Sequence, residues 1–295
     1  METKIDLKNE FLRIGHKTAF SARLIEKDYH LTRILHKLSE HKIEKLVFKG
    51  GTCLNKCYLG FYRLSEDLDF VFNQDVKNFS KTQFRKILDD LRRELIQILE
   101  SLNLKTSNIL GSGWKMINSD ENKIIGLEII TNYDSIIDTS KQNIKLEISF
   151  RNKLKKPTKK QSIHHEFFDE LGEPFLKEDV KLEVISLEEN FAEKFRALVT
   201  RENIAIRDIF DIYFILKNQI LKFDKNILKI ALEKINETPD LEYKEKDFFE
   251  FIEHLDHKIG DFKEKELVTV LKAEEIVKPE EMILLIKKNV LNLRN

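Results

Sequence analysis

Two aspartates one residue apart, Asp67 and Asp69, stand in the apolar segment 64–72 of this sequence. In a strand, alternate side chains point to opposite faces, so both carboxylates would share one face, opposite Leu68 and Phe70. Two such carboxylates repel each other and lose hydration on a buried strand, so structure alone rarely selects them. A divalent cation removes this objection, because Mg²⁺ takes carboxylate oxygens together with substrate phosphate oxygens. The pair therefore predicts a metal site, with a water-facing edge strand as the alternative.

A glycine turn precedes the aspartates. The segment 45–48 is predicted to be a short buried strand, which Gly50 and Gly51 interrupt, and Thr52 is the expected N-cap of a following helix. The first amides of a helix have no partner within it and the helix dipole favours negative charge there, so a phosphate group suits this position. Alone, such a turn is more often only a capped connection. The neighbouring aspartates favour a phosphate-binding turn.

A third carboxylate usually completes a site of this kind, because it helps to hold the metal or to deprotonate the attacking hydroxyl. Glu147 is the first candidate, since it lies in the predicted strand 143–150 on the face opposite the apolar residues. Glu128 has a similar position in the predicted strand 123–130 and is the rival. Either glutamate can instead be an exposed residue of a half-buried strand.

Charged residues also fall on apolar helix faces later in the chain. A helix is predicted to begin at Leu187 after the cap Ser186, and Lys194 falls inside its apolar stripe. Asp208 and Asp211 lie three residues apart on a helix that is apolar nearly all round, so both need partners. A structural ion pair and a functional role are equally compatible with this pattern. The basic residues available for such pairs are Arg201, Arg207 and Lys194.

The bulk properties of the chain restrict the class of protein. Its 51 basic and 51 acidic side chains cancel, so contact with nucleic acid would depend on a local patch. The polar N-terminus and the lack of a long apolar run predict a cytoplasmic protein that makes no use of a membrane. The pattern of strands and helices divides the chain into N-terminal helices (1–44), a core with the candidate strands (45–185) and a helical C-terminal subdomain (186–295).

The residues of these motifs resemble the sequence motifs of a known family. Lys-Gly-Gly-Thr-x-Leu-x-Lys from Lys49, followed by Arg-x-Ser-x-Asp-Leu-Asp-Phe from Arg63, looks like the AbiEii/AbiGii toxin branch of the DNA-polymerase-β-type nucleotidyltransferases. The segments 26–29 and 193–213 are similar to further motifs of that branch, and the likeness covers residues 20–216 in scattered blocks. It implies an α+β fold, in which a polymerase-β-like core with a mixed sheet is flanked by helices and joined to a helical C-terminal subdomain.

The resemblance also implies an activity. The expected reaction is Mg²⁺-dependent transfer of a nucleotide from an NTP to an acceptor, with release of pyrophosphate; Mn²⁺ could replace Mg²⁺. The family indicates the 3′ end of a tRNA, or another RNA, as acceptor and a separate antitoxin as partner, in a toxin–antitoxin or abortive-infection system. The alternatives are a protein- or self-nucleotidylating enzyme and an inactive nucleotide-binding regulator.

Roles follow for named residues. Asp67, Asp69 and Glu147 are expected to bind the metal. By resemblance, Lys194 contacts the triphosphate and Asp211 is a further functional acid, with Asp208 as its alternative. The residues expected to contact the nucleotide, or to orient the acidic strand, are Lys49, Gly50, Gly51, Thr52, Lys56, Arg63, Ser65 and Lys194.

Overall fold

The computed structural model of the protein describes residues 6–43, 45–75, 79–106, 113–118, 124–150, 153–238, 241–258, 271–272 and 277–294. The chain forms two compact units, each described here by itself. The first unit comprises Met1–Lys153 and Thr158–Val184, and the second comprises Leu154–Pro157 and Ile185–Asn295. The finer boundaries 1–44, 45–185 and 186–295 stay a prediction.

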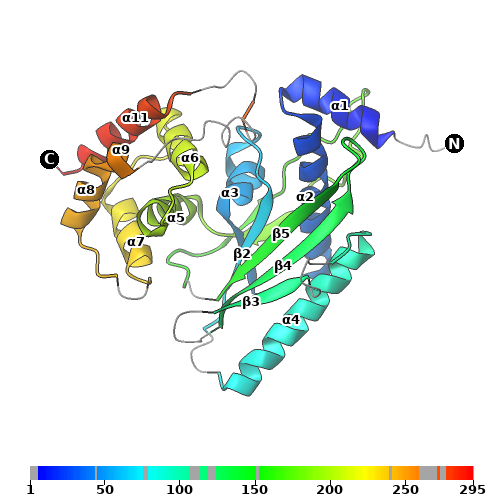
Figure 1. Ribbon diagram of the computed structural model, residues 1–295, viewed down its shortest axis with the longest axis horizontal. Coiled ribbons are helices and arrows are strands. Elements are labelled where there is room, and N and C mark those ends of the chain that lie inside the picture. The colour runs from blue at the N-terminus through cyan, green and yellow to red at the C-terminus, as the bar shows by residue number, and fades with distance from the viewer. Residues whose placement is uncertain are drawn as a thin grey trace. The chain divides into compact units, whose positions relative to one another are not determined.

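A mixed sheet forms the centre of the first unit, and Figure 1 shows strands β2 to β5 side by side. Within the described residues the strand order is β3-β4-β5-β2-β1-β7-β6. β2 pairs parallel with β5, and β1 pairs parallel with β7, whereas the other neighbours are antiparallel. The strands are β1 (Leu46–Lys49), β2 (Asp67–Phe72), β3 (Trp114–Asn118), β4 (Ile124–Asp134), β5 (Lys141–Ser149), β6 (Lys159–Ser162) and β7 (Lys181–Val184).

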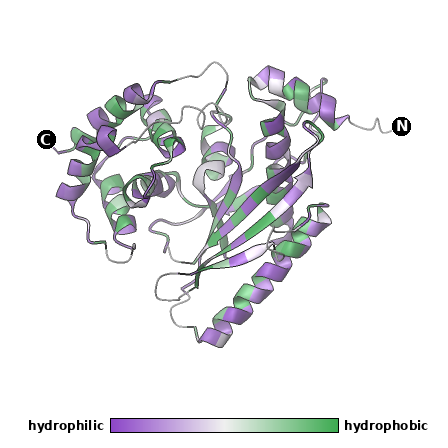
Figure 2. Cartoon of the chain, viewed as in Figure 1, coloured by the Kyte–Doolittle hydropathy of each residue, from purple (hydrophilic) through white to green (hydrophobic). Residues whose placement is uncertain are grey.

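Polar and apolar residues alternate along these strands, as the purple and green bands of Figure 2 show for β5. In β5 the apolar Ile144, Leu146 and Ile148 and the polar Gln142 are buried, and they alternate with polar or charged residues that are at least partly exposed. One face of the sheet is therefore packed, and the other carries the charges.

The hairpin between β4 and β5 is tighter than the sequence predicts. We expected a loop from residue 131 to 142, but the two strands stay paired as far as Asp134 and Lys141. Thr131 pairs with Ile144 and Tyr133 with Gln142, so cross-strand pairing overrides the turn-forming residues nearby. The turn is closed where Asp138 accepts hydrogen bonds from Ser140, which leaves only residues 135–140 as connection.

Helices pack around this sheet. They are α1 (Leu7–Thr18), α2 (Ala22–His41), α3 (Gly50–Cys53), the π-helical turn η1 (Leu54–Leu59) and α4 (Lys81–Ser101). Side chains cap three of them, because Asp6, Ser21 and Ser80 accept hydrogen bonds from backbone amides of the first turns of α1, α2 and α4. Phe11, Phe20 and Phe167 belong to one apolar cluster, which joins α1 and α2 to the core.

The second unit is helical. Its described helices are α5 (Leu187–Thr200), α6 (Ile206–Lys217), α7 (Lys225–Ile235), α8 (Glu245–Glu253), α9 (Leu255–Lys258) and α11 (Pro279–Leu291). The rings of Phe195, Phe223 and Phe248 pack together in its core, with centroids 4.7 to 5.9 Å apart. A predicted helix from residue 264 onward lies partly outside the described residues. Among the helices described in both units, none combines the length and apolarity that crossing a membrane would require.

One buried glutamate explains why residues 154–157 belong to the second unit. Glu189 accepts hydrogen bonds from the backbone amides of Lys155 and Lys156, at 2.8 to 2.9 Å, so it fixes this lysine-rich connector against α5. Ser186 caps α5 by accepting from the Glu189 amide, as predicted. The Glu189 carboxylate is engaged elsewhere, so the reciprocal half of the predicted capping box does not form.

Candidate active site

A row of charged residues crosses five strands of the sheet on one face. Lys49 on β1 lies opposite Asp69 on β2, Asp69 lies beside Glu147 on β5, Glu147 opposes Glu128 on β4, and Glu128 opposes Lys115 on β3. Directly paired residues share a face of the sheet, so all five side chains project to the same side. We call Lys49, Asp69, Glu147, Glu128 and Lys115 the charged row. Three acids therefore stand between two lysines.

Asp67 adds a second acid on the same face. It precedes Asp69 by two residues and pairs with Lys145, which precedes Glu147 by two. Both aspartates are half-buried, whereas Leu68 on the other face is fully buried. The predicted alternation of β2 is therefore present in the fold. The carboxylates lie neither in the core nor in bulk solvent.

The glycine turn lies directly against Asp69. Gly50 has φ +80°, a left-handed conformation that favours glycine. A Cβ at this position would stand 2.4 Å from Asp69 Oδ2, and a Cβ at Gly51 would stand 2.5 Å from Arg63 Nη2. No side chain other than hydrogen fits either position without displacing its neighbour. The bend and the carboxylate thus form one site.

Thr52 is not the N-cap that the sequence predicts. The helix already begins at Gly50, and Lys49 occupies the cap position. The two glycines can adopt both the bend and the first helical positions. The helix therefore begins two residues earlier than predicted, and Thr52 lies inside its first turn. Its hydroxyl is buried and donates a hydrogen bond to the Asp67 carbonyl oxygen at 2.5 Å. Thr52 therefore ties the helix to the strand that carries both aspartates.

Arg63 and Ser65 lie next to the bend on the chain segment that leads into β2. The Arg63 side chain is 2% exposed, and its Nη1 donates to the Leu64 carbonyl oxygen at 3.0 Å. Ser65 Oγ is 3.4 Å from the position that a Cβ on Gly51 would take. Both residues support the bend from the protein side. The geometry fits the expected orienting role better than direct contact with a ligand.

Lys56 is engaged inside the protein. Its Nζ lies 2.6 Å from Asp28 Oδ2 and 2.8 Å from Thr32 Oγ1, and the side chain has no exposed surface. Burial lowers the pKa of Lys56, and the Asp28 carboxylate opposes that effect. Because its ammonium already has a buried counter-charge, we leave Lys56 out of the phosphate contacts proposed below.

The electrostatics of the acidic strand depend on the neighbouring lysines. Burial raises the pKa of Asp69; Lys49 acts to lower it, and Glu147 and Asp67 act to raise it further. Burial also acts to lower the pKa of Lys145, but Asp67, Glu147 and Asp69 outweigh it and raise that pKa. The acids therefore repel one another, and a cation beside them is stabilised.

Glu147 is better placed than Glu128 to act with Asp69. Glu147 is the direct neighbour of Asp69, whereas Glu128 lies one strand further and pairs with Lys115 at 2.9 Å. Glu147 Oε2 is 3.3 Å from Lys145 Nζ. The sequence alone does not distinguish these two glutamates, because each lies on the polar face of its own predicted strand.

The donor set suits a cation that binds together with a phosphate. Among the described residues, no three aspartate, glutamate, histidine or cysteine side chains are grouped closely enough to hold a metal by themselves. Mg²⁺ commonly takes only one or two carboxylates and completes its shell with substrate phosphate oxygens and water. Asp67 and Asp69 supply two carboxylates, and the backbone at Gly50 can approach the Asp69 carboxylate so closely only because it carries no Cβ. These residues fit Mg²⁺ in that manner.

The second unit holds its own charged cluster. Lys194 Nζ lies 2.8 Å from Asp208 Oδ1 and 2.7 Å from Asp211 Oδ2, and Arg201 also pairs with Asp208. Lys194 and both aspartates are buried. The ion pairs join α5 to α6, so the structural role considered from the sequence is present. The roles of Lys194 and Asp211 towards a nucleotide stay predictions.

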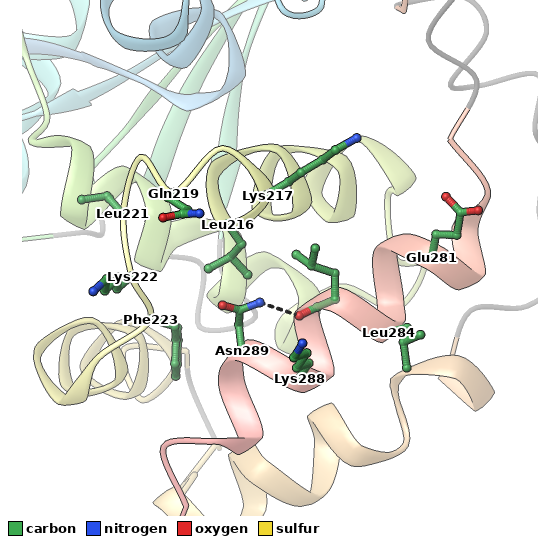
Figure 3. Close-up of a pocket in the computed structure, with 11 residues that line it drawn as sticks. Leu216, Lys217, Gln219, Leu221, Lys222, Phe223, Glu281, Leu284, Lys288 and Asn289 are labelled. Carbon is green, nitrogen blue, oxygen red and sulfur yellow. Dashed lines mark hydrogen bonds between the residues drawn. The ribbon is translucent and has the colours of Figure 1, made fainter.

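A groove in the second unit was not foreseen from the sequence. It measures about 670 Å³ and lies between the end of α6 with its following loop and α11, as Figure 3 shows. Leu216, Leu284 and Phe223 contribute apolar surface, and Lys217 and Lys288 lie among the lining residues. The contributing segments are some 60 residues apart, and none carries a motif. Only the packing of the helices brings them together.

Comparison with known proteins agrees with this fold. The family model described as nucleotidyl transferase AbiEii toxin, type IV toxin–antitoxin system, matches residues 33–275. No curated protein sequence matches. The crystal structures of JHP933 from Helicobacter pylori and of a "putative nucleotidyltransferase" from H. pylori are 17% and 18% identical to the chain, with TM-scores of 0.54 and 0.53. Each covers 93% of this chain, and the chain covers 93% and 96% of theirs. The predicted α+β fold and the predicted family are confirmed.

Proposed function

The chain belongs to the AbiEii family of nucleotidyltransferase toxins from type IV toxin–antitoxin systems, and from this premise we propose that it transfers a nucleotide from an NTP to the 3′ end of a tRNA and releases pyrophosphate. Mg²⁺, or Mn²⁺ in its place, is the proposed cofactor. The family implies an antitoxin partner, and growth arrest in the manner of abortive infection is the proposed consequence. The proposed place of action is the cytoplasm, which contains both substrates.

One observation carries the proposal. The left-handed bend at Gly50 stands so close to the Asp69 carboxylate that a Cβ would meet Oδ2 at 2.4 Å. A turn that can accept phosphate therefore adjoins a carboxylate that can share a cation with that phosphate. Glycine at position 50 is explained by this contact and by its φ of +80°. A connection that only reversed the chain direction would not need the carboxylate there.

The bend and the acids beside it would have separate roles in the reaction. The backbone amides at Gly50 and Gly51 and the ammonium of Lys49 would bind the outer phosphates, and Thr52 would hold β2 in place. Asp67 and Asp69 would bind the divalent cation. When bound, Mg²⁺ aligns the phosphates and neutralises charge on the attacking and leaving oxygens. Glu147 would either complete the cation site or accept the proton of the attacking hydroxyl.

Lys194 and Asp211 stay part of the proposal on the strength of the family alone. Two carboxylates hold the Lys194 ammonium in one position. Asp211 is fully buried, so its proposed role is to position Lys194.

Labelled nucleotides test the reaction and its alternatives together. The full chain is incubated with each α-³²P-labelled NTP, Mg²⁺ and total RNA, beside the variant Asp69→Asn and a reaction with EDTA. Label at the 3′ end of tRNA that depends on Asp69 and on Mg²⁺ supports the proposal. Label in protein instead supports protein- or self-nucleotidylation, and NTP binding without incorporation supports an inactive regulator. Either of these outcomes contradicts transfer to tRNA.

A further inference from the structure

Lys145 occupies an unusual place among the acids of the first unit. On β5 it pairs with Asp67 of β2, and it shares the face of Glu147 two residues later. Its Nζ lies 3.3 Å from Glu147 Oε2. Both side chains are 35% exposed, so the contact is open to exchange with solvent. The local sequence around Lys145 indicates no role for it.

The surroundings of Lys145 are those that a metal ion would have. Lys145 is the register partner of Asp67, its Nζ contacts Glu147, and Asp69 is the register partner of Glu147, so the ammonium lies on the same face as all three acids. Lys49 also faces Asp69, but from the opposite neighbouring strand. Lys49 therefore approaches the acids from β1, whereas Lys145 lies on β5 beside Asp67 and Glu147. A positive charge at this point removes most of the mutual repulsion of the three acids.

We propose that Lys145 is an internal counter-ion, which stabilises the acids while no metal is bound and moves away from Glu147 when a divalent cation enters. The inference rests on the proposed function, since it assigns Asp67, Asp69 and Glu147 to a metal site. Displacing Lys145 from Glu147 costs free energy and so weakens the binding of free metal. The metal therefore binds as a complex with the nucleotide. Lys145 acts through the ligands and is a positioning residue.

Metal affinity without nucleotide tests this inference directly. The probe is Mn²⁺, titrated into the full chain and followed by the electron paramagnetic resonance signal of the free ion. Lys145→Met keeps the length of the side chain and removes its charge. Its Mn²⁺ affinity should rise about tenfold or more, because one unit charge within ~5 Å of a partly screened site has an effect of that order. The melting temperature of metal-free Lys145→Met should fall, and Mn²⁺ should restore it.

Lys115→Met is the matched control. Lys115 also pairs with a carboxylate of the charged row, Glu128, but it lies on β3 and away from Asp67. Its loss should leave the Mn²⁺ affinity unchanged. Lys145→Gln serves as a second variant in case methionine impairs folding, and it should show the same rise. Weaker or unchanged Mn²⁺ binding in folded Lys145 variants would overturn the inference.

The binding test separates this inference from the reaction itself. If the chain transfers no nucleotide but Lys145→Met still binds Mn²⁺ more tightly, the counter-ion role stands and the proposed reaction fails. If transfer to tRNA is observed while Lys145→Met binds Mn²⁺ no better, the reaction stands and the counter-ion role fails. Binding of Mn²⁺ that Asp69→Asn does not reduce would contradict the assignment of the site on which the inference depends.

Discussion

A charged cluster of the second unit and the charged row of the first unit hold charge in different ways. In the second unit, Lys234 is fully buried and lies 2.6 Å from Glu189 and 3.0 Å from Glu193, so one ammonium and two carboxylates form a closed triad. In the first unit, the aspartates of β2 are half-buried, and the neighbouring ion pair between Lys145 and Glu147 is 3.3 Å long, with both side chains 35% exposed. The ion pairs of Lys234 are short and buried. The acids beside Asp69 have a longer ion pair and partial access to solvent.

This difference separates structural charges from functional ones. A buried ion pair that loses one partner leaves an uncompensated charge in the core, so the fold depends on it even where the intact pair adds little stability. Half-buried acids that repel one another cost stability, and a ligand can recover that cost by binding. We therefore expect substitutions in the triad to affect folding. Substitutions of Asp69 and Glu147 in the charged row should affect activity.

The largest effect should come from Asp69→Asn. The amide keeps the shape of the side chain but removes a charge that holds the cation, so nucleotide transfer should fall about a thousandfold. Since Glu147 and Asp67 both act to raise the pKa of Asp69, removing its charge also relieves repulsion. The variant should unfold at the same urea concentration as the parent or at a higher one. A stability loss as large as the activity loss would break the comparison.

Lys234→Met should show the reverse pattern. Removing the ammonium takes a buried counter-charge away from Glu189 and leaves Glu193 with Arg196 at 3.1 Å, which should cost about 3–5 kcal/mol of unfolding free energy. Glu189 also fixes the connector at Lys155, so increased proteolysis at residues 154–157 should accompany the loss. Urea denaturation measures the first effect and limited proteolysis the second.

Lys229→Met is the control for this change. It lies on the same helix, α7, but is exposed, and its substitution should alter the unfolding free energy by less than about 0.5 kcal/mol. Transfer activity of Lys234→Met, measured below its unfolding transition and normalised to folded protein, should equal that of the parent. A specific loss of activity in the folded variant would show that the triad is more than structural.

Within the charged row, Glu147→Gln and Glu128→Gln should separate two otherwise similar residues. Glu147 adjoins Asp69, so Glu147→Gln should lower kcat about a hundredfold, as expected for loss of a metal ligand or a general base. Glu128 pairs with Lys115, whose side chain is 62% exposed, and Glu128→Gln should change kcat less than about threefold. Steady-state rates of both variants decide the matter. Equal losses would extend the active site across β4.

The sequence was most informative where a pattern is local. Alternation in β2 put Asp67 and Asp69 on one face, and glycine at position 50 indicated the bend. Two predictions from the sequence were wrong. The length of β4 and β5 depends on cross-strand pairing, which extends the hairpin beyond the predicted strands. The start of α3 depends on the backbone conformations that two glycines allow, which places Thr52 inside the helix. These are tertiary effects that local propensity does not contain.

The partners of Lys56 and Lys145 could not be predicted from the sequence, because they lie on distant elements. The turn that carries Lys56 is π-helical, so the usual 100° per residue does not give the direction of its side chain. Its partner, Asp28, lies on α2, and nothing in the local sequence connects the two. Lys145 lies beside Asp67 only because β5 pairs with β2 in this parallel register. Register between distant strands follows from the whole fold.

The smallest effect concerns a buried titratable group that belongs to neither pattern. His36 on α2 is 8% exposed, and no hydrogen-bond partner for its Nε2 exists among the described residues. Burial, assisted by His165 and Lys56, lowers the pKa of His36 from 6.5 to about 4. The unfolded chain therefore binds a proton in the pH range between these values while the folded chain does not. Stability should fall by about 1 kcal/mol for each pH unit below 6.5.

His36→Phe keeps a ring and removes the titration, so unfolding free energy should depend less steeply on pH between 6.5 and 4 than in the parent. Urea denaturation at several pH values measures the two slopes. His16→Phe, on the exposed face of α1, should leave the slope of the parent unchanged. Equal slopes for the parent and His36→Phe would mean that His36 takes up its proton in the folded state, and that its surroundings provide a counter-charge. His36 would then be a buried charge with a partner, as Lys56 and Lys234 are, and the contrast would remain one between such buried pairs and the acids beside Asp69.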